Sequence, residues 1–423
     1  MVVHLSLSVL DSTSAPSSSS SFEKKSLNTL SLAVAKAKRV VVVTGAGISC
    51  SSGIPDFRSS DGLYALVKSR YPDVVLKGRD LFSASLFRDP ESTRVFYSFI
   101  AELKRSIDAA KPAPTHHFIK TLDSKGKLLR SYTQNIDGFE EKLHISTTGS
   151  VKGKEKKMNI KEIKNVQLHG DIHRVRCTIC SAESACLAEY LALFREGAPP
   201  NCPECTERSN ARVSRKARPL TIGTLRPNIV LYDEVHPMGE EIGILSTHDI
   251  ARKPDMLIIM GTSLKVHGIK KLVKDFAGAV HSPSATNGKS SRGQNASQSS
   301  PPVVSSSKRP STHPQSARSA RIVVFVNRSA PPADLASIID YWVEGDTDTW
   351  VAKCEADWRR SRPQDWEIQP TLFDSLREKG HGVPPLAEEI NTFKIVKGAT
   401  KSAKPKPRSK CTPPCCIRAV ISV

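Results

Sequence analysis

The chain has 423 residues, 39% of them hydrophobic and 25% charged, and a formal net charge of +20. This length allows two or three domains, and no apolar run approaches the roughly 20 residues that a membrane-spanning helix requires. Ten cysteines without an apolar secretory segment at the start predict a reducing compartment and disfavour a fold held by disulfides.

The positive charge is concentrated in a few segments. Residues 282–321 contain six Lys and Arg and residues 394–423 contain eight, with no acidic residue in either. Residues 146–164 and 204–218 hold smaller excesses, which leaves the rest of the chain about neutral. Such polycations predict nonspecific contact with nucleic acid or chromatin through phosphate groups. The alternative is that they only keep the protein soluble.

We expect three segments to be disordered because their composition cannot bury enough apolar surface to offset chain entropy. These are the serine-rich residues 1–24, the Ser-, Pro-, Asn- and Gln-rich residues 282–320, and the Lys- and Pro-rich residues 394–418.

Between these segments, short β-branched runs alternate with helical patterns. This predicts an α/β fold, a doubly wound, Rossmann-like parallel sheet covered by helices on both faces, with an inserted zinc-ribbon module and a helical module. The expected strands are 39–44, 129–133, 228–232, 255–260 and 321–326. The expected helices are 25–38, 91–106, 115–124 and 268–279.

The first strand ends in the glycine-rich turn Gly45-Ala46-Gly47-Ile48. The glycines let the backbone approach a pyrophosphate, and the helix that follows offers N–H donors to it. Position 50 is Cys50 where a G-x-G-x-x-G turn has its third glycine, and no acidic residue is evident about 20 residues later. A hydride-transferring dehydrogenase is therefore disfavoured. The next loop adds a carboxylate, a ring and a guanidinium: Asp56, Phe57 and Arg58.

Four cysteines form two C-x-x-C pairs separated by 21 residues. They are Cys177, Cys180, Cys202 and Cys205. Each pair offers two thiolates from one tight turn, so the set predicts one tetrahedral Zn²⁺. Because thiolates take all four positions, the metal is expected to be structural. The other six cysteines suggest no second ligand set.

Several motifs together resemble the sirtuin family, in that family's order and at compatible spacings. They are GAGIS and SGIPDFRS near residues 45–59, TQNID at 133–137, LHG at 168–170, the two cysteine pairs, GTSL at 261–264 and VNR at 326–328. The resemblance covers residues 26–360, apart from the insertions at 146–164 and 282–320. It implies an NAD-dependent protein-lysine deacylase, with acetyl as the preferred acyl group.

The resemblance also implies residue roles. His169 would be the general base that accepts a ribose hydroxyl proton. Asp56, Asn135 and Asp137 would surround the nicotinamide, Phe57 would cap its pocket, and Arg58 would contact phosphates. The further cofactor-binding residues would be Gly45, Ala46, Gly47, Ile48, Gln134, Gly261, Thr262, Ser263, Asn327 and Thr347.

The acyl-lysine peptide would pair with the segment that contains Val230, Leu231 and Tyr232, while Val266 would form the opposite edge. Tyr232-Asp233-Glu234 replaces the usual Phe-Gly-Glu of the family. The form LRPNIVLYDE, the long insertion and the basic tail look closest to the fungal nuclear class I branch, which acts on histone H3. We therefore expect a nuclear protein with an acetylated histone as substrate and no membrane partner.

The expected organisation has a disordered N-terminus at 1–24, a catalytic domain at 25–360 and a C-terminal extension at 361–423 with a basic disordered tail. The expected parts of the domain are a Rossmann-like core (25–60, 115–170 and 220–360), the zinc module (170–220), a basic insertion (146–164) and a low-complexity insertion (282–320). Two alternatives stay open: mono-ADP-ribosyl transfer, which uses the same bond cleavage, and a catalytically weak chromatin-silencing scaffold.

Overall fold

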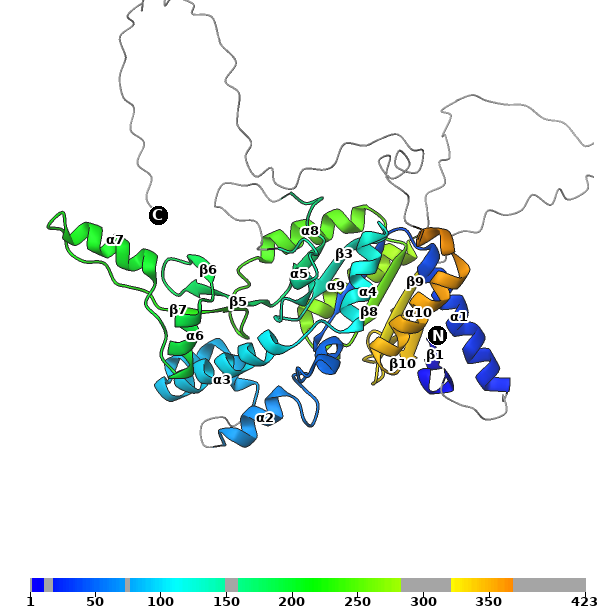
Figure 1. The fold of residues 1–423 in the computed structure, drawn as a ribbon, viewed down its shortest axis with the longest axis horizontal. Coiled ribbons are helices and arrows are strands. Elements are labelled where there is room, and N and C mark those ends of the chain that lie inside the picture. Colours follow the sequence, from blue (N-terminus) through cyan, green and yellow to red (C-terminus); the bar gives the residue numbers. More distant parts are fainter. Residues whose placement is uncertain (1, 11–17, 73–76, 149–158, 283–320, 368–423) are drawn as a thin grey trace, which may run out of the picture. The chain divides into compact units, whose positions relative to one another are not determined.

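Seven parallel strands and a separate antiparallel sheet of three strands organise the computed structural model, which describes residues 2–10, 18–72, 77–148, 159–282 and 321–367 (Figure 1). In spatial order the large sheet contains β1 (Val3–Ser6), β10 (Tyr341–Glu344), β9 (Ile322–Asn327), β8 (Met256–Met260), β2 (Val40–Thr44), β3 (Leu128–Thr133) and β4 (Asn165–Gln167). The small sheet contains β6 (Glu183–Ala185), β5 (Gly170–Cys177) and β7 (Leu225–Ile229). Most of the basic insertion, nearly all of the low-complexity insertion and the basic tail lie outside the described residues.

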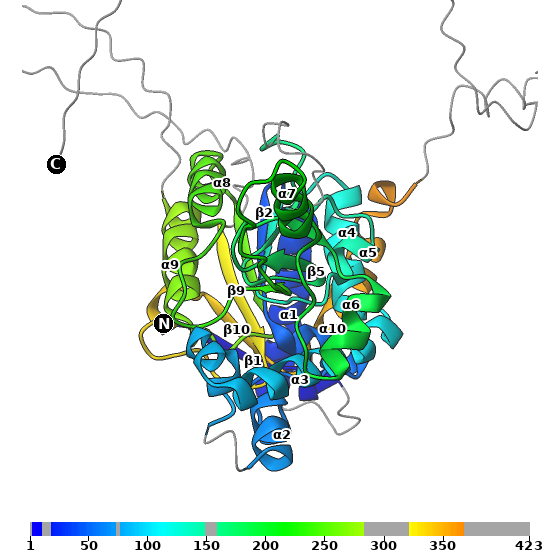
Figure 2. The same ribbon diagram turned by 90° about the vertical axis from the view of Figure 1, so that its left-hand side faces the viewer.

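Both faces of the large sheet are covered, and side chains of β2, β8 and β9 alternate between them. One face packs on α1 (Ser18–Lys36), α4 (Pro114–Ser124) and α10 (Thr347–Ser361), and the other on α8 (Gly239–Ala251) and α9 (His267–His281). Figure 2 shows α8 and α9 on one side of the strands and α4 and α10 on the other. The predicted doubly wound sheet is therefore confirmed.

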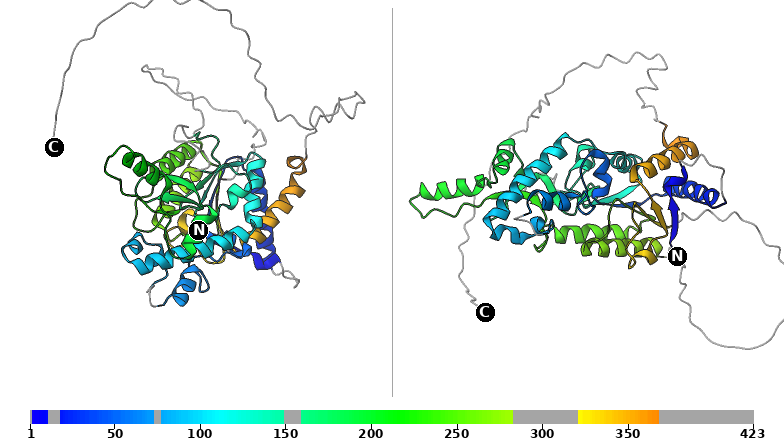
Figure 3. Two further views of the ribbon diagram at one scale, coloured as in Figure 1. Left: turned by 60° about the vertical axis from the view of Figure 1, so that its left-hand side comes forward. Right: turned by 90° about the horizontal axis from the view of Figure 1, so that it is seen from below.

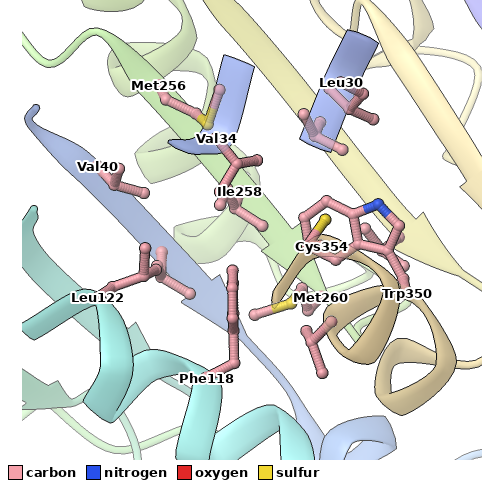
Figure 4. Packing of buried hydrophobic residues seen from close by; sticks show 14 of the residues in the cluster. Leu30, Val34, Val40, Phe118, Leu122, Met256, Ile258, Met260, Trp350 and Cys354 are labelled. Atoms are coloured by element: carbon pink, nitrogen blue, oxygen red, sulfur yellow. The ribbon is translucent and has the colours of Figure 1, made fainter. Parts of the chain in front are cut away.

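The face beneath α4 and α10 is tightly filled (Figure 4). Phe118 of α4 and Trp350 of α10 contact each other edge to face at a centroid distance of 6.0 Å, and both are fully buried against Ile258 and Met260. Burying one such side chain contributes about 1.5–3 kcal/mol. This core fixes the strands whose ends carry the loops described below.

The helical module and the small sheet share a second core. The module contains α2 (Leu63–Arg70), two 3₁₀ turns (Asp80–Phe82 and Ala84–Arg88) and α3 (Pro90–Ala109), and the small sheet adjoins α6 (Ala188–Arg195) and α7 (Pro203–Val213). Helix α3 begins where it does because Asp89 caps it, accepting a hydrogen bond from Ser92 N at 2.7 Å, and Pro90 occupies its first turn. The views in Figure 3 show α7 projecting from the rest of this region.

The predicted helices and four of the five predicted strands of the parallel sheet are confirmed. Most ends shift by up to three residues, whereas α1 begins at Ser18, seven residues before the predicted start. The exception among the strands is residues 228–232. The strand β7 ends at Ile229 and pairs antiparallel with β5 in the small sheet, so it does not join the parallel sheet. A short apolar run does not reveal which sheet it joins, because strand partners are set by tertiary packing.

The prediction of a disordered N-terminus is wrong for Val3–Ser6 and Leu7–Leu10, and for the residues from Ser18 on. Strand β1 pairs in parallel with β10 at the edge of the large sheet, and Leu5 is fully buried. The serine-rich composition of residues 1–24 did not indicate this four-residue strand. Among the described residues, no helix combines the length and apolar character needed to cross a bilayer.

Candidate functional site

A cavity of about 1340 Å³ opens at the carboxyl edge of the parallel sheet. All seven strands run in the same direction, so the loops after β2, β3, β4, β8, β9 and β10 meet at this edge. The small sheet contributes the segment that follows β7. The volume exceeds the 300–1,000 Å³ usual for a small-molecule pocket, which leaves room for a large ligand and part of a second one.

Most of the residues predicted to bind the cofactor or the peptide line this cavity. Those that do are Gly45, Ala46, Gly47, Asp56, Phe57, Arg58, Gln134, His169, Val230, Leu231, Tyr232, Gly261, Thr262, Ser263, Val266, Asn327 and Thr347. The other three, Ile48, Asn135 and Asp137, are buried behind its wall.

The glycine turn crosses the loop that follows β8 at very short range. A Cβ on Gly47 would lie 2.8 Å from Gly261 O, and one on Gly45 would lie 2.7 Å from Thr262 Cβ. Gly261 has φ = 61°, in the left-handed region. Only glycine permits this approach, which exposes the turn's backbone to the cavity.

Ser49 is the centre of a buried hydrogen-bond chain. Its Oγ accepts from Asn135 Nδ2 at 3.1 Å and donates to Asp137 Oδ2 at 2.8 Å. His116 Nδ1 accepts from Ala113 N, so its Nε2 carries the proton and lies 3.5 Å from Ser49 Oγ. The Ser49 hydroxyl thus donates its one proton and accepts from its neighbours, and it orients both Asn135 and Asp137.

The side-chain amide oxygen of Asn135 is available to another group. Its Oδ1 is buried and has no hydrogen-bond partner among the described residues. Burial and, secondly, the charge of Asp137 raise the pKa of Glu140 to about 8, so Glu140 is neutral at pH 7 and adds no second negative charge beside Asp137. An unsatisfied carbonyl oxygen next to one carboxylate fits an amide N–H donor or a developing positive charge.

His169 lines the cavity, and one of its two ring nitrogens is hydrogen-bonded to the backbone. Its Nδ1 lies 2.9 Å from Gln134 O, and because a carbonyl can only accept, Nδ1 carries the proton. Nε2 is therefore the nitrogen that can accept a proton. Burial lowers the pKa of His169 from its ordinary value of 6.5, so the imidazole is neutral at pH 7.

Asp56 closes the loop that carries Phe57 and Arg58. Its Oδ1 accepts from Arg58 N and Ser59 N, each at 2.8 Å, and its O accepts from Leu63 N at 2.6 Å. Partial burial opposes ionisation, but the hydrogen bonds from Ser59 and Arg58 lower the pKa of Asp56. Its side chain thus shapes the loop as well as lining the cavity.

The segment after β7 is held on both sides. Val230 N donates to His169 O at 2.9 Å, and Glu234 accepts from Leu231 N at 2.8 Å while pairing with Arg226 at 2.7 Å. Asp233, where the family usually has Gly, adopts φ = 64°, a conformation that Asp tolerates better than most residues. The departure from the family pattern therefore preserves the local turn.

At the other end of the cavity, Thr347 and Asp348 begin α10. Thr115 Oγ1 lies 3.0 Å from Thr347 Oγ1, and Asp348 accepts from Thr115 N at 2.9 Å and Ser51 Oγ at 2.6 Å. These contacts tie α10 to α4 and to the glycine turn. The sequence predictions assigned no role to Ser49, His116, Thr115 or Asp348. Ser49 lies within the motif GAGIS, but the motif does not show which side chains Ser49 meets in the fold.

The four predicted zinc ligands come together in one cluster. Their Sγ atoms all lie within 4.8 Å of one another, with Cys177 to Cys205 and Cys180 to Cys202 each at 3.7 Å. Ile179 N and Cys180 N donate to Cys177 Sγ at 3.4 Å. Four thiolates about 2.3 Å from a central ion are separated by just under 4 Å, so the arrangement fits tetrahedral Zn²⁺. Among the described residues, the other cysteines, Cys50, Cys186 and Cys354, are free and form no further cluster.

Comparison with known proteins agrees with this architecture. Residues 45–268 match the model of the Sir2 family. The NAD-dependent histone deacetylase HST3 of Candida albicans is 46% identical over 255 residues, which cover 59% of this chain and 52% of that protein. HST3 of Saccharomyces cerevisiae is 38% identical over 331 residues, which cover 76% of this chain and 66% of that protein. The chain therefore spans between half and two thirds of the length of these relatives.

Solved structures agree at the level of the fold. A Sir2 homologue in complex with NAD superposes with a TM-score of 0.50 at 22% identity, covering 80% of this chain and 94% of that one. A mutant Sir2 homologue in complex with ADP-ribose gives a TM-score of 0.51 at 20% identity, covering 81% and 99%. With the family model spanning more than half of its residues, the chain belongs to the Sir2 family.

Proposed function

We propose that the protein is an NAD-dependent protein-lysine deacetylase that yields nicotinamide, O-acetyl-ADP-ribose and a deacetylated lysine. Two observations carry this proposal. His169 lines the cavity with an Nε2 that has no hydrogen-bond partner among the described residues, and the Asn135–Ser49–Asp137 chain lies directly behind the cavity wall that the glycine turn forms. The names of the relatives, NAD-dependent histone deacetylases, support the same activity.

In this proposal the residues divide the work by position. Bound NAD would supply the ADP-ribosyl group that accepts the acetyl group. Asn135 Oδ1 would accept an amide N–H of the nicotinamide, and the Asp137 carboxylate would favour positive charge on the neighbouring ribose. His169 Nε2 would take the proton of a ribose hydroxyl, a role that typically contributes about 10²–10⁴-fold to the rate.

The remaining cavity residues would bind and orient. The backbone N–H of Ala46 and the side chains of Thr262 and Ser263 would hold phosphates, with Arg58 as their counter-charge. Gly45, Gly47 and Ile48 would shape this wall, because their own N–H groups donate to Met260 O, Gly261 O and Gly45 O. Gln134 and Gly261 would complete that wall, Asn327 would hold the adenosine ribose, and Thr347 the adenine. Phe57 would keep water out of the nicotinamide pocket.

The peptide substrate would lie across the mouth of the cavity. The backbone carbonyls of Val230 and Leu231 would face the peptide on one side, and Val266 would close the other. Tyr232 would border this side without a backbone contact, since its N–H and C=O already bond to Phe82 and Ala84. Because affinity from the backbone tolerates varied side chains, selectivity would come from the acetyl-lysine pocket. We infer an acetylated histone as substrate, and hence action in the nucleus, from the relatives' names. One Zn²⁺ bound by the four cysteines would stabilise the fold without taking part in the reaction.

Product analysis tests this proposal. The purified chain is incubated with NAD and an acetylated histone H3 peptide, and mass spectrometry follows both reactants. We expect deacetylated peptide and O-acetyl-ADP-ribose, both absent when NAD is omitted. ADP-ribose attached to protein, with the acetyl group retained, would instead indicate mono-ADP-ribosyl transfer. Neither product from peptide or from nucleosomes would favour a scaffold.

We also propose nonspecific contact with nucleic acid, through the described end of the zinc module as well as the tail. Exposed cations cluster on the second half of α7 and the turn after it; they are Arg208, Arg212, Arg215, Lys216 and Arg218. Arg208 pairs with Glu204 at 2.8 Å, whereas the other four make no ion pair with any described acidic side chain. Their positive charge is therefore left for phosphate groups.

Neutralising two of these cations tests the contact. The double variant Arg212→Gln and Arg215→Gln should bind duplex DNA more weakly, with the slope of log K against log salt smaller by about 1.8, because each lost phosphate contact removes about 0.9. The matched control is Lys271→Gln with Lys274→Gln, which removes the same charge from α9, where both lysines already pair with aspartates. Equal slopes in the two double variants would contradict a role for α7.

A further inference from the structure

Tyr232 lies where the segment after β7 meets the helical module, and backbone bonds hold it there. Tyr232 N donates to Phe82 O at 2.8 Å, and Ala84 N donates to Tyr232 O at 2.9 Å. Ser83 Oγ also donates to the Asp233 carboxylate at 3.0 Å. The position of this segment therefore does not depend on the Tyr232 side chain.

The Tyr232 side chain reaches instead to the loop that follows the glycine turn. Its hydroxyl accepts from Arg58 Nη2 at 3.2 Å and lies 3.1 Å from the hydroxyl of Tyr64. Its ring lies beneath the guanidinium of Arg79, 4.2 Å from the ring centroid. Arg58, Tyr64 and Tyr232 all line the cavity. The Tyr232 hydroxyl therefore links the segment after β7 to the loop that carries Arg58 and Tyr64.

Arg58 and Tyr64 belong to one closed loop. Leu63 N donates to Asp56 O and Tyr64 N donates to Phe57 O, which brings the two ends of the loop together. Burial and, secondly, the hydrogen bond with Tyr232 raise the pKa of Tyr64, so the Tyr64 phenol stays protonated at neutral pH. A change in the position of Tyr232 is therefore transmitted to the whole loop, including Arg58.

We propose that Tyr232 is a positioning residue that couples peptide binding to binding of the ADP-ribosyl part of NAD. Through its hydroxyl, the peptide-binding segment orients Arg58, whose guanidinium has five N–H donors and so keeps others for phosphate oxygens. The inference rests on the proposed function. By linkage, each ligand then tightens the other by the same factor. A phenylalanine, usual at this position in the family, keeps the ring over which Arg79 lies but lacks the hydroxyl.

Calorimetry on the full chain tests the coupling without turnover. ADP-ribose is titrated with and without a saturating acetyl-lysine peptide, in the wild type and in Tyr232→Phe. In the wild type we expect the peptide to tighten ADP-ribose binding at least fivefold, within the usual range of such couplings. In Tyr232→Phe this ratio should fall toward one. Tyr64→Phe, which removes the other phenol of the contact, should also lower the ratio.

Tyr97→Phe is the matched control. Tyr97 is buried in the core of the helical module, its hydroxyl donates to Leu225 O at 3.4 Å, and it does not line the cavity. This variant should keep the wild-type ratio. A wild-type ratio in Tyr232→Phe, or a ratio of one in the wild type, would overturn this inference and leave the proposed function standing. No binding of ADP-ribose to the wild type would overturn the proposed function and the inference with it.

Discussion

His169 illustrates how one backbone contact prepares a side chain for chemistry. The carbonyl of Gln134 holds the proton on Nδ1 and leaves Nε2 to accept one, while burial keeps the ring neutral at pH 7. The motif LHG identified the residue in the sequence, but the tautomer depends on Gln134, which is 35 positions away. Ser49 could not be assigned for the same reason, since its role arises from Asn135 and Asp137 meeting it in three dimensions.

The acid side of the pH profile follows from His169. A base works in its neutral form, which predominates above its pKa, and burial lowers that pKa below 6.5. We therefore expect kcat/KM for deacetylation to be flat through neutral pH and to fall with a midpoint below 6.5, because kcat/KM reports groups of the free enzyme. A midpoint above 6.5 would contradict the assignment of His169, or the neutral state given to it here.

At the scale of elements, sequence patterns predicted elements better than their partners. The buried runs before Gly45 and Gly261 are unmistakable strands because all their residues are apolar or β-branched. Residues 228–232 form a similar run apart from Asn228, yet the strand at this place ends at Ile229 and joins the small antiparallel sheet. Strand β1 was missed altogether, because four residues with one buried Leu carry too little pattern to be seen beside a serine-rich stretch.

The zinc module should depend on its metal. Cys177→Ser removes one of the four ligands. The binding free energy of structural zinc is about 10–16 kcal/mol in small modules and is coupled to folding. We therefore expect this variant to lose its zinc and to give a lower yield of soluble protein. Cys186→Ser is the matched control, a partly exposed free cysteine in the same region and outside the cluster. Zinc content by elemental analysis should fall only in Cys177→Ser. Full zinc occupancy in that variant would contradict the four-cysteine site.

At the scale of the whole molecule, the parallel direction of the seven strands explains why the site lies where it does. Loops that are far apart in the sequence, such as those at Gly45, His169 and Gly345, meet at one edge because each follows the carboxyl end of a strand. This convergence was predictable from the motifs and the fold class. The contacts of Tyr232 with Arg58 and Tyr64 could not be predicted, since they depend on how the helical module packs against the segment after β7.

The release of nicotinamide tests the central claim most directly. The purified chain is incubated with NAD, with and without an acetylated histone H3 peptide, and His169→Ala serves as the variant that lacks the proposed base. We expect release that requires the peptide, one nicotinamide for each acetyl group removed, and no deacetylation by His169→Ala. Release that ignores the peptide and leaves its acetyl group in place, or full deacetylation by His169→Ala, would contradict the account.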